Sequence, residues 1–436
     1  MDASNGSQSR YVVVSADTHG GTKPHGYRDY LDPEFRDDFD DWLTNVYPPM
    51  EQGYYAVVEQ STQTWGADED GPHTDAFLQV MEDGMGDASH RVRALEADGV
   101  VASVIYPGAS VLCTAPFSSG GEVFGMRGRD YSRAHKVAGT RAYNRWLAEY
   151  CGEYPAQLAG VIQVVDYADL DEAVGLIEEA ARAGLRGGIA IPSLDIDQPG
   201  LHTSHWDRLW NVCEEYHLPI NSHAAFRVDS RLFGKDDANL NGMLYFATAQ
   251  SFQALPLAIF MLGGVLDRHP SLHIVFSEQY ADWVPTAIGT LQERFEEGFG
   301  MEMFRSSLSL DPRGYWERNF GVGATFMTPK EARMRHDIGL GTIMWGSDFP
   351  HPEGTYPHTR ESLRLSFADV PTDELRMILG TNACRIYGFD LDALQAIADR
   401  VGPTVEELAT PLEDIPKGFR RFSVKPSEDR DLVAAR

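Results

Sequence analysis

The chain has 436 residues, of which 43% are hydrophobic, and a formal net charge of −28 at pH 7. Its length allows a large hydrophobic core, and its negative charge argues against nucleic acid or an anionic membrane as a partner. No apolar run approaches the roughly 18 residues of a membrane span, and the N-terminus lacks the apolar centre of a signal peptide. We therefore expect a cytoplasmic protein.

The cysteines indicate neither a disulfide framework nor a thiolate zinc site. The four of them, Cys113, Cys151, Cys213 and Cys384, lie far apart and form no CxxC pair. Reduced, mostly structural thiols are the simplest interpretation.

Short apolar, β-branched runs alternate with helical patterns along the chain, as in a parallel sheet covered by helices. Eight candidate strands follow one another, at residues 11–16, 100–106, 158–165, 185–191, 218–222, 272–277, 320–326 and 341–345. Eight such units predict an α/β protein with a closed (β/α)8 TIM barrel. The first turn has no glycine-rich phosphate loop, which argues against an open doubly wound sheet.

The helix after the third strand has the clearest signals. Asp169 is its predicted N-cap, Glu172 stands at the capping-box position, and Gly184 marks its end. Apolar residues follow at helical spacing, namely Ala173, Leu176, Ile177 and Ala180.

Two connections are too long for minimal loops and predict insertions after strands one and five. Residues 20–89 form a lid-like insertion whose aromatic side chains either contact an apolar substrate or pack the insertion onto the barrel. The barrel is assigned to residues 1–390, with a closing helix at 372–387. Residues 391–436 are assigned to a C-terminal arm, which is irregular or partly helical because prolines interrupt it.

Polar residues that follow the strands are the candidate site, because strand C-terminal ends meet at the active face of a barrel. Asp17 and His19 end the first strand and are two residues apart, so both side chains point the same way. His223 ends the fifth strand, where the alternative is a hydrogen-bonded structural histidine.

Glu278 follows the sixth strand, and an ionised carboxylate at that place needs a cation or several donors. Asp348 follows the eighth strand, and His351 is a further candidate ligand. Five carboxylates and imidazoles at one end of separate strands predict a metal centre with these residues as catalytic and metal-binding groups.

Four other residues are candidate substrate contacts, namely Arg227, Arg231, Trp283 and His358. The two arginines, with Lys235, follow strand five and either meet phosphates of a carrier or form a solvated charged loop.

The order D-x-H, His, Glu and then W-G-S-D-x-P-H resembles the metal-dependent amidohydrolase superfamily, in particular the branch containing aminocarboxymuconate semialdehyde decarboxylase. The resemblance spans roughly residues 11–389 and implies a distorted TIM barrel with metal ligands after strands one, five, six and eight. It also implies a homodimer.

Two positions depart from the family pattern. Asp17 replaces the first histidine of H-x-H, and Glu278 replaces the histidine after strand six. In addition, the fourth strand has no lysine for a bridging carbamate. The resulting set of three carboxylates and two histidines suits iron or manganese at least as well as zinc.

This ligand set resembles a subgroup of the superfamily, the nonheme diiron monooxygenases that include a diterpenoid hydroxylase of platensimycin and platencin biosynthesis. The resemblance implies two iron ions, dioxygen, an electron donor, and a hydrophobic acyl or acyl-coenzyme A substrate hydroxylated at an unactivated carbon.

The alternative is a hydrolase or decarboxylase with one zinc or manganese ion, in which Asp348 serves as general base. A metal-binding scaffold without activity is a third interpretation, but it gives no reason for polar residues at four separate strand ends.

Overall fold

In the computed structural model, residues 9–53, 85–108, 115–118, 129–224, 226, 244, 248–325, 327–351 and 354–414 are described. None of the described helices is long and apolar enough to cross a membrane. All eight predicted strands are present, namely β1 (Val14–Gly20), β2 (Ala102–Pro107), β3 (Leu158–Gly160), β4 (Ile189–Ala190), β5 (Ile220–His223), β6 (Ile274–Ser277), β7 (Phe320–Thr325) and β8 (Ile343–Gly346).

The strands form two parallel sheets that meet at both edges. One sheet has the order β1-β2-β3 and the other β4-β5-β6-β7-β8. Parallel bridges join Ile162 to Ile189 at one edge and Thr18 to Phe349 at the other. This pairing, in chain order around a ring, is the one that a (β/α)8 barrel requires.

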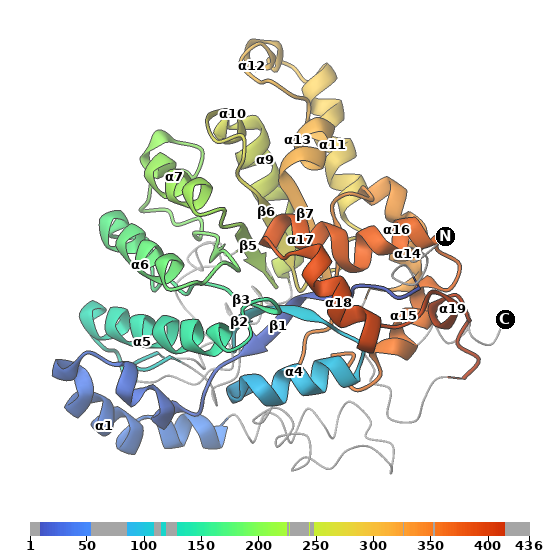
Figure 1. Cartoon of the computed structure of the whole chain (residues 1–436). Coiled ribbons are helices and arrows are strands. Elements are labelled where there is room, and N and C mark those ends of the chain that lie inside the picture. The colour runs from blue at the N-terminus through green and yellow to red at the C-terminus, as the bar shows by residue number, and fades with distance from the viewer. Residues whose placement is uncertain are drawn as a thin grey trace.

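Helices surround the strands in Figure 1. The described α-helices are α1 (Arg36–Asn45), α4 (Ala88–Ala97), α5 (Arg133–Gly152), α6 (Leu170–Arg182), α7 (Asp207–Glu215), α9 (Ala254–Leu262), α10 (Val265–Arg268), α11 (Val284–Glu297), α12 (Glu302–Arg305), α13 (Pro312–Asn319), α14 (Pro329–Ile338), α15 (Thr359–Phe367), α16 (Thr372–Arg376), α17 (Asn382–Tyr387), α18 (Leu391–Val401) and α19 (Val405–Leu408).

The helix α6 begins as the sequence predicts, with one difference. The Asp169 side chain accepts a hydrogen bond from the Glu172 N–H at 3.1 Å, which satisfies a backbone donor of the first turn. The Glu172 carboxylate does not complete the capping box but pairs with Arg133 on α5. Gly184 follows the helix with φ of 103°, a conformation that favours glycine.

The predicted closing helix at 372–387 consists of α16, a π-helical turn at Met377–Thr381 and α17. It closes the N-terminal end of the barrel. Ile386 of α17 lies against Gly321 at the start of β7, where a Cβ atom would come within 2.8 Å of it. The site described below is therefore at the opposite end of the strands.

The C-terminal arm packs on the barrel where it is described. Leu394, Ala398 and Leu408 of α18 and α19 are buried. The N–H of Tyr11 donates to the Pro403 carbonyl at 2.9 Å, so the arm also holds the chain that leads into β1.

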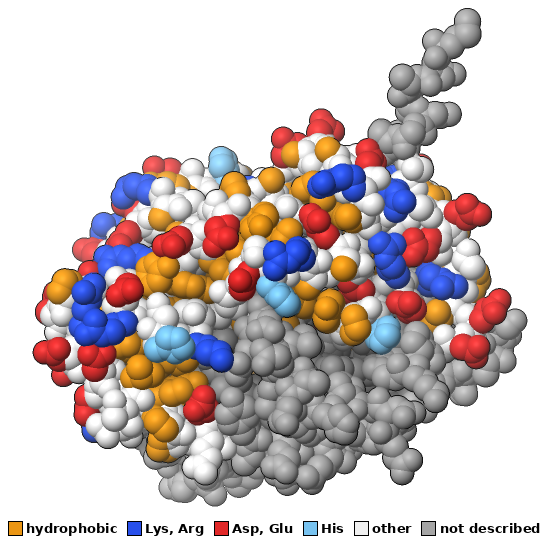
Figure 2. Space-filling model, turned by 60° about the horizontal axis from the view of Figure 1, so that its bottom comes forward, with side chains coloured by type: hydrophobic (Ala, Val, Ile, Leu, Met, Phe, Trp, Pro, Cys, Tyr) orange, Lys and Arg blue, Asp and Glu red, His pale blue; other side chains and the backbone are white. Residues whose placement is uncertain are grey.

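Acidic and basic side chains lie interspersed over the described part of the face in Figure 2. Several described acidic side chains are paired, as in the ion pairs of Asp32 with Arg141 at 3.3 Å and with Arg145 at 2.8 Å. On the described part of the face in Figure 2, neither charge gathers into one broad region.

Candidate metal centre

Residues from β1, β5, β6 and β8 meet at the C-terminal ends of the strands. Asp17 and His19 lie within β1 rather than after it, because the strand runs on to Gly20. His223 is the last residue of β5, and Glu278 and Asp348 follow β6 and β8 closely. The structure therefore brings together all the strand-end residues that the sequence indicates.

A β-bulge in β1 aims its two candidate ligands. Ser15 pairs with Ser103 of β2, and Thr18 pairs with Ile105, so the register shifts between Ser15 and Thr18. A bulge of this kind redirects side chains and is common beside active sites. Asp17 and His19 are both fully buried and point into the same cluster.

Unusual backbone conformations mark the ends of the neighbouring strands. Glu278 has φ of 53° and Asp348 has φ of 55°, values that residues other than glycine rarely adopt. Such conformations cost on the order of 1–3 kcal/mol each and persist where the surrounding structure enforces them, often at functional sites. The strain here falls on two of the three carboxylates that the sequence analysis selects.

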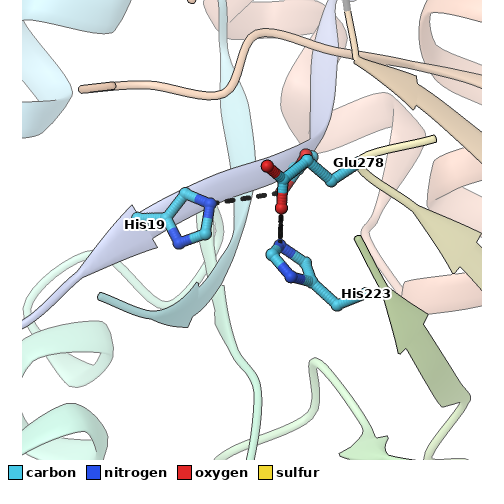
Figure 3. A group of neighbouring side chains, drawn as sticks. His19, His223 and Glu278 are labelled. Carbon is cyan, nitrogen blue, oxygen red and sulfur yellow. Dashed lines mark hydrogen bonds and ion pairs between the residues drawn. The ribbon is translucent and has the colours of Figure 1, made fainter. Parts of the chain in front are cut away.

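Four side chains form the first candidate ligand group, namely Asp17, His19, His223 and Glu278. Figure 3 shows the three labelled members pointing toward one another from β1, β5 and the end of β6. The Nε2 atom of His223 lies 3.2 Å from Oε2 of Glu278 and 3.3 Å from Oδ1 of Asp17. One potential ligand atom from each of the four lies within 4.8 Å of the others.

A second group consists of His19, Asp348 and His351, so it shares His19 with the first. Asp348 Oδ1 lies 3.1 Å from His19 Nε2 and 3.0 Å from His351 Nδ1. The rings of His19 and His351 stack with centroids 3.9 Å apart. The carboxylate of Asp348 is thus held between two imidazoles.

Burial and charge shift the pKa values of these groups in opposite directions. Burial lowers the pKa of His19, and the neighbouring His351 lowers it further. Burial would also lower the pKa of His223, but the carboxylates of Glu278 and Asp17 outweigh it and raise that pKa. Burial raises the pKa of Glu278, whose side chain is nevertheless 26% exposed.

Asp348 has a lowered pKa despite its burial. Burial alone would raise its pKa, but His351 and His19 outweigh burial and hold that pKa below its ordinary value. Asp348 is therefore ionised at neutral pH, although its side chain is fully buried. In the described part of the chain neither of its carboxylate oxygens receives a regular hydrogen bond.

His19 lies between two acceptors. Its Nδ1 atom is 3.1 Å from the Pro107 carbonyl, and its Nε2 atom is 3.1 Å from the Asp348 carboxylate. Burial lowers the pKa of His19, and a neutral imidazole has only one proton for these two contacts. A cation near the ring would complete the second contact, and a histidine whose other nitrogen is held by a backbone carbonyl is typical of metal ligands.

The residues present therefore fit a divalent metal ion. Imidazole and carboxylate donors suit manganese, iron and zinc, and the cluster includes no thiolate. Buried carboxylates crowded among imidazoles are costly without such a charge.

A polar network lies in the barrel interior beside His223. The ring of Tyr106 packs against His223 with centroids 4.3 Å apart. Its hydroxyl donates to Asn221 Oδ1 at 3.0 Å, and Tyr387 of α17 donates to the same oxygen at 3.1 Å. The network supports His223 from the barrel interior, and the sequence analysis did not select these residues.

Of the four predicted substrate contacts, the structure describes Trp283 and His358. Arg227 and Arg231 lie outside the described residues. Trp283 is half-buried and packs edge-on against Phe276 with centroids 5.2 Å apart, and its indole nitrogen has no hydrogen-bond partner among the residues that the structure describes. His358 is half-buried and precedes α15. Their roles toward a substrate stay predictions.

The aromatic residues of the first insertion pack onto the barrel where they are described. Trp42 is fully buried against Phe39, Tyr47 and Phe117. The packing interpretation is thus the one that applies to Trp42 and Tyr47, whereas Tyr54, Tyr55 and Trp65 lie outside the described residues.

Sequence reasoning also missed Arg91, a fully buried cation that contacts the end of β1. A signal for it exists. Arg91 falls in the apolar stripe of α4, which includes Ala88, Val92 and Leu95, and a charge at such a position needs buried partners.

Comparisons with known proteins identify the family. A model of the family described as amidohydrolase matches residues 115–389, which is more than half of the chain, so the chain belongs to this family. The match begins beyond β1, so it does not include Asp17 and His19. A search of curated proteins gives no match.

Solved structures with the same fold include several decarboxylases. The 5-carboxyvanillate decarboxylase LigW of Sphingomonas paucimobilis is 18% identical, with a TM-score of 0.57 over 87% of this chain and 100% of that one. A 2,6-dihydroxybenzoate decarboxylase of Rhizobium is 14% identical, with a TM-score of 0.55 over 87% and 99%.

A third similar structure, a variant of the 5-carboxyvanillate decarboxylase of Novosphingobium aromaticivorans, contains bound manganese. It is 18% identical to this chain, with a TM-score of 0.56 over 87% of this chain and 97% of the other. At these identities the likeness shows the fold. The chain thus has the TIM-barrel fold of an enzyme family, and residues that could hold a metal ion lie together in it. The comparisons offer no support for iron, dioxygen or a coenzyme A substrate.

Proposed function

We propose that this protein is a manganese- or zinc-dependent decarboxylase or hydrolase that acts on a carboxylate-bearing small molecule. The observation that carries the proposal is the convergence of Asp17, His19, His223 and Glu278, whose potential ligand atoms lie within 4.8 Å of one another, because carboxylates crowded together inside a protein are costly without a cation. Manganese in a structural neighbour and the decarboxylases among such neighbours support this choice over an oxygenase.

Asp17, His19, His223 and Glu278 would hold the metal. A bound divalent cation supplies Lewis acidity toward a substrate carboxylate or a water molecule. The protein's own part is to orient the substrate against these ligands and to exclude bulk water from a cluster whose innermost members are fully buried.

Asp348 is the proton-transfer group in this proposal. Its lowered pKa keeps it ionised, and His351 Nδ1 at 3.0 Å can exchange a proton with it. His351 is 9% exposed, so it lies between the buried carboxylate and the outside of the cluster. In a decarboxylation this pair would deliver a proton to the carbon that loses carbon dioxide, and in a hydrolysis it would accept a proton from water.

The test is turnover without oxygen. The chain is stripped of metal with a chelator, reloaded separately with manganese, zinc or iron, and incubated anaerobically with a panel of hydroxylated aromatic carboxylic acids while carbon dioxide release is followed. Release with manganese or zinc supports the proposal. Its absence from every acid and ester tested, together with oxygen-dependent turnover, would contradict it.

One observation favours a second candidate, the diiron monooxygenase. Six potential ligands, three of them carboxylates, divide into two groups that share His19. Carboxylate-rich sites with imidazoles suit iron. This candidate predicts about two irons per chain, oxygen consumption and a requirement for reductant, and its acyl or acyl-coenzyme A substrate, electron donor and homodimer stay predictions.

A further inference from the structure

Arg91 is buried beside the metal centre without a carboxylate partner. Its side chain is fully buried in α4, and among the described residues no Asp or Glu forms an ion pair with it. Its Nη2 donates to the carbonyl of His19, and its Nε donates to the Tyr150 hydroxyl at 2.9 Å. A buried guanidinium is costly, so these contacts must hold it firmly in place.

The same guanidinium also contacts the other strand that supplies the centre. It lies over the ring of Phe349, 5.2 Å from its centroid, and Phe349 directly follows Asp348. The N–H of His19 donates to the Phe349 carbonyl at 2.7 Å. Arg91 thus touches both sides of the backbone joint at which β1 and the end of β8 present His19 and Asp348.

Gly20 packs tightly beside this joint. A Cβ atom on Gly20 would lie 2.7 Å from Ile105 Cγ2 and force that side chain to move, whereas its distance of 3.5 Å to Arg91 Nη2 would be an ordinary contact. The Gly20 carbonyl in turn accepts a hydrogen bond from the Tyr143 hydroxyl at 2.9 Å. The chain leaving β1 is therefore held by α4 and α5 together.

We propose that Arg91 is a positioning residue of the metal centre, which fixes His19 and Asp348 relative to each other through the carbonyl of His19 and the ring of Phe349. The inference rests on the proposed metal centre and adds a residue outside its ligand set. A guanidinium is required because a single planar fork meets a carbonyl, a hydroxyl and an aromatic face at once. A lysine has the charge but cannot make all three contacts.

The experiment measures metal affinity without turnover. Wild type, Arg91→Met, Arg91→Lys and the control Arg318→Met are stripped of metal and titrated with manganese or cobalt in competition with a chelator, and the visible spectrum of bound cobalt reports ligand geometry. Arg318 is a matched control, because its Nη2 donates to the Leu266 carbonyl at 2.8 Å and its guanidinium lies 5.3 Å from the Tyr315 ring, away from the centre.

We expect Arg91→Met to bind metal at least about tenfold more weakly with an altered cobalt spectrum, as for outer residues that orient metal ligands. The metal affinity of Arg91→Lys should lie between those of wild type and Arg91→Met. Arg318→Met should bind metal like wild type. A folded Arg91→Met protein with wild-type affinity and spectrum overturns the role of Arg91. If Arg91→Met does not fold, Arg91→Lys decides by the same two readouts.

The control arms separate this inference from the proposed function. Wild type that binds neither metal overturns the metal centre itself, and the role of Arg91 with it. If wild type binds the metal and the Arg91 variant binds it equally well, only the positioning role of Arg91 is overturned.

Discussion

The Nε2 atom of His19 lies 3.1 Å from Oδ1 of Asp348, although His19 is in the first strand of the barrel and Asp348 follows the last. The backbone brings them there: the N–H of Asp348 donates to the Asp17 carbonyl at 2.9 Å, and the N–H of His19 donates to Phe349 at 2.7 Å. The same backbone hydrogen bonds that close the barrel therefore also bring these two side chains together.

Replacing Glu278 by Gln should weaken metal binding at least about tenfold, roughly 1.4 kcal/mol, because the amide keeps the size but loses the anionic donor beside His223. Metal per chain after dialysis and a chelator competition provide the measurement. Glu293→Gln on the exposed side of α11 is the control. Full occupancy in the Glu278 variant would show that its carboxylate is no ligand.

Replacing Asp348 by Asn should lower kcat by about 10²–10⁴ while most metal is retained, because the change removes the proton-transfer group from between His19 and His351. The assay is carbon dioxide release from an acid that the wild type decarboxylates, alongside metal analysis of both proteins. A variant that loses its metal in proportion to its activity would instead place Asp348 among the essential ligands.

Two glycines make a matched pair for stability. Gly188 has φ of 92°, and a Cβ there would collide with the Pro219 carbonyl and lie 2.6 Å from Asn221 Nδ2, so Gly188→Ala should cost about 3 kcal/mol or more. Gly175 is exposed within α6 with nothing near its Cβ position, so Gly175→Ala should stabilise by about 0.5–1 kcal/mol. Urea unfolding of the two variants should shift the midpoint in opposite directions.

The Gly188 variant tests the barrel joint as well. The Gly188 carbonyl accepts the hydrogen bond from the Ile162 N–H at 2.8 Å that connects β3 to β4. A Gly188→Ala midpoint equal to that of wild type would mean that this joint tolerates movement.

Asp98 should make stability fall as pH rises. It is 6% exposed, and burial raises its pKa from 3.8 to about 7, although its oxygens accept from the Thr359 N–H at 3.2 and 3.3 Å. Because the folded state favours the protonated acid, its contribution is complete below pH 3.8 and is lost as pH rises through about 7.

The measurement is the melting temperature of wild type and Asp98→Asn across this pH window. The melting temperature of the variant should rise relative to wild type as pH rises, which corresponds to a change of on the order of 4 kcal/mol in their relative stability. Asp392→Asn, at an exposed position of α18, should instead run parallel to wild type. Parallel curves for Asp98→Asn would contradict the shifted pKa.

Local patterns predicted the strands and the ligand cluster because strand C-terminal ends always meet at one face of a barrel. Asp17, His223 and Glu278 could be selected in this way, each from its own strand. The bounds of β1 were wrong by several residues, since apolar character ends at Ala16 while parallel pairing continues to Gly20.

The contacts that residues outside the strands make with the site were beyond local patterns, although the charge in the apolar stripe of α4 indicates that Arg91 needs buried partners. Arg91 reaches the centre from α4 and Tyr387 reaches Asn221 from α17, and both contacts depend on packing between distant segments. The same holds for the failed capping box of α6, where Arg133 of another helix takes the Glu172 carboxylate.

The joint between β8 and β1 also fixes when the centre can form as the protein is made. Asp17 and His19 leave the ribosome early, whereas Asp348 and His351 emerge only after nearly the whole barrel. A nascent chain therefore has an incomplete set of donors until its last strand docks against its first. In the proposed metal centre, the complete donor set is therefore available only in a finished molecule.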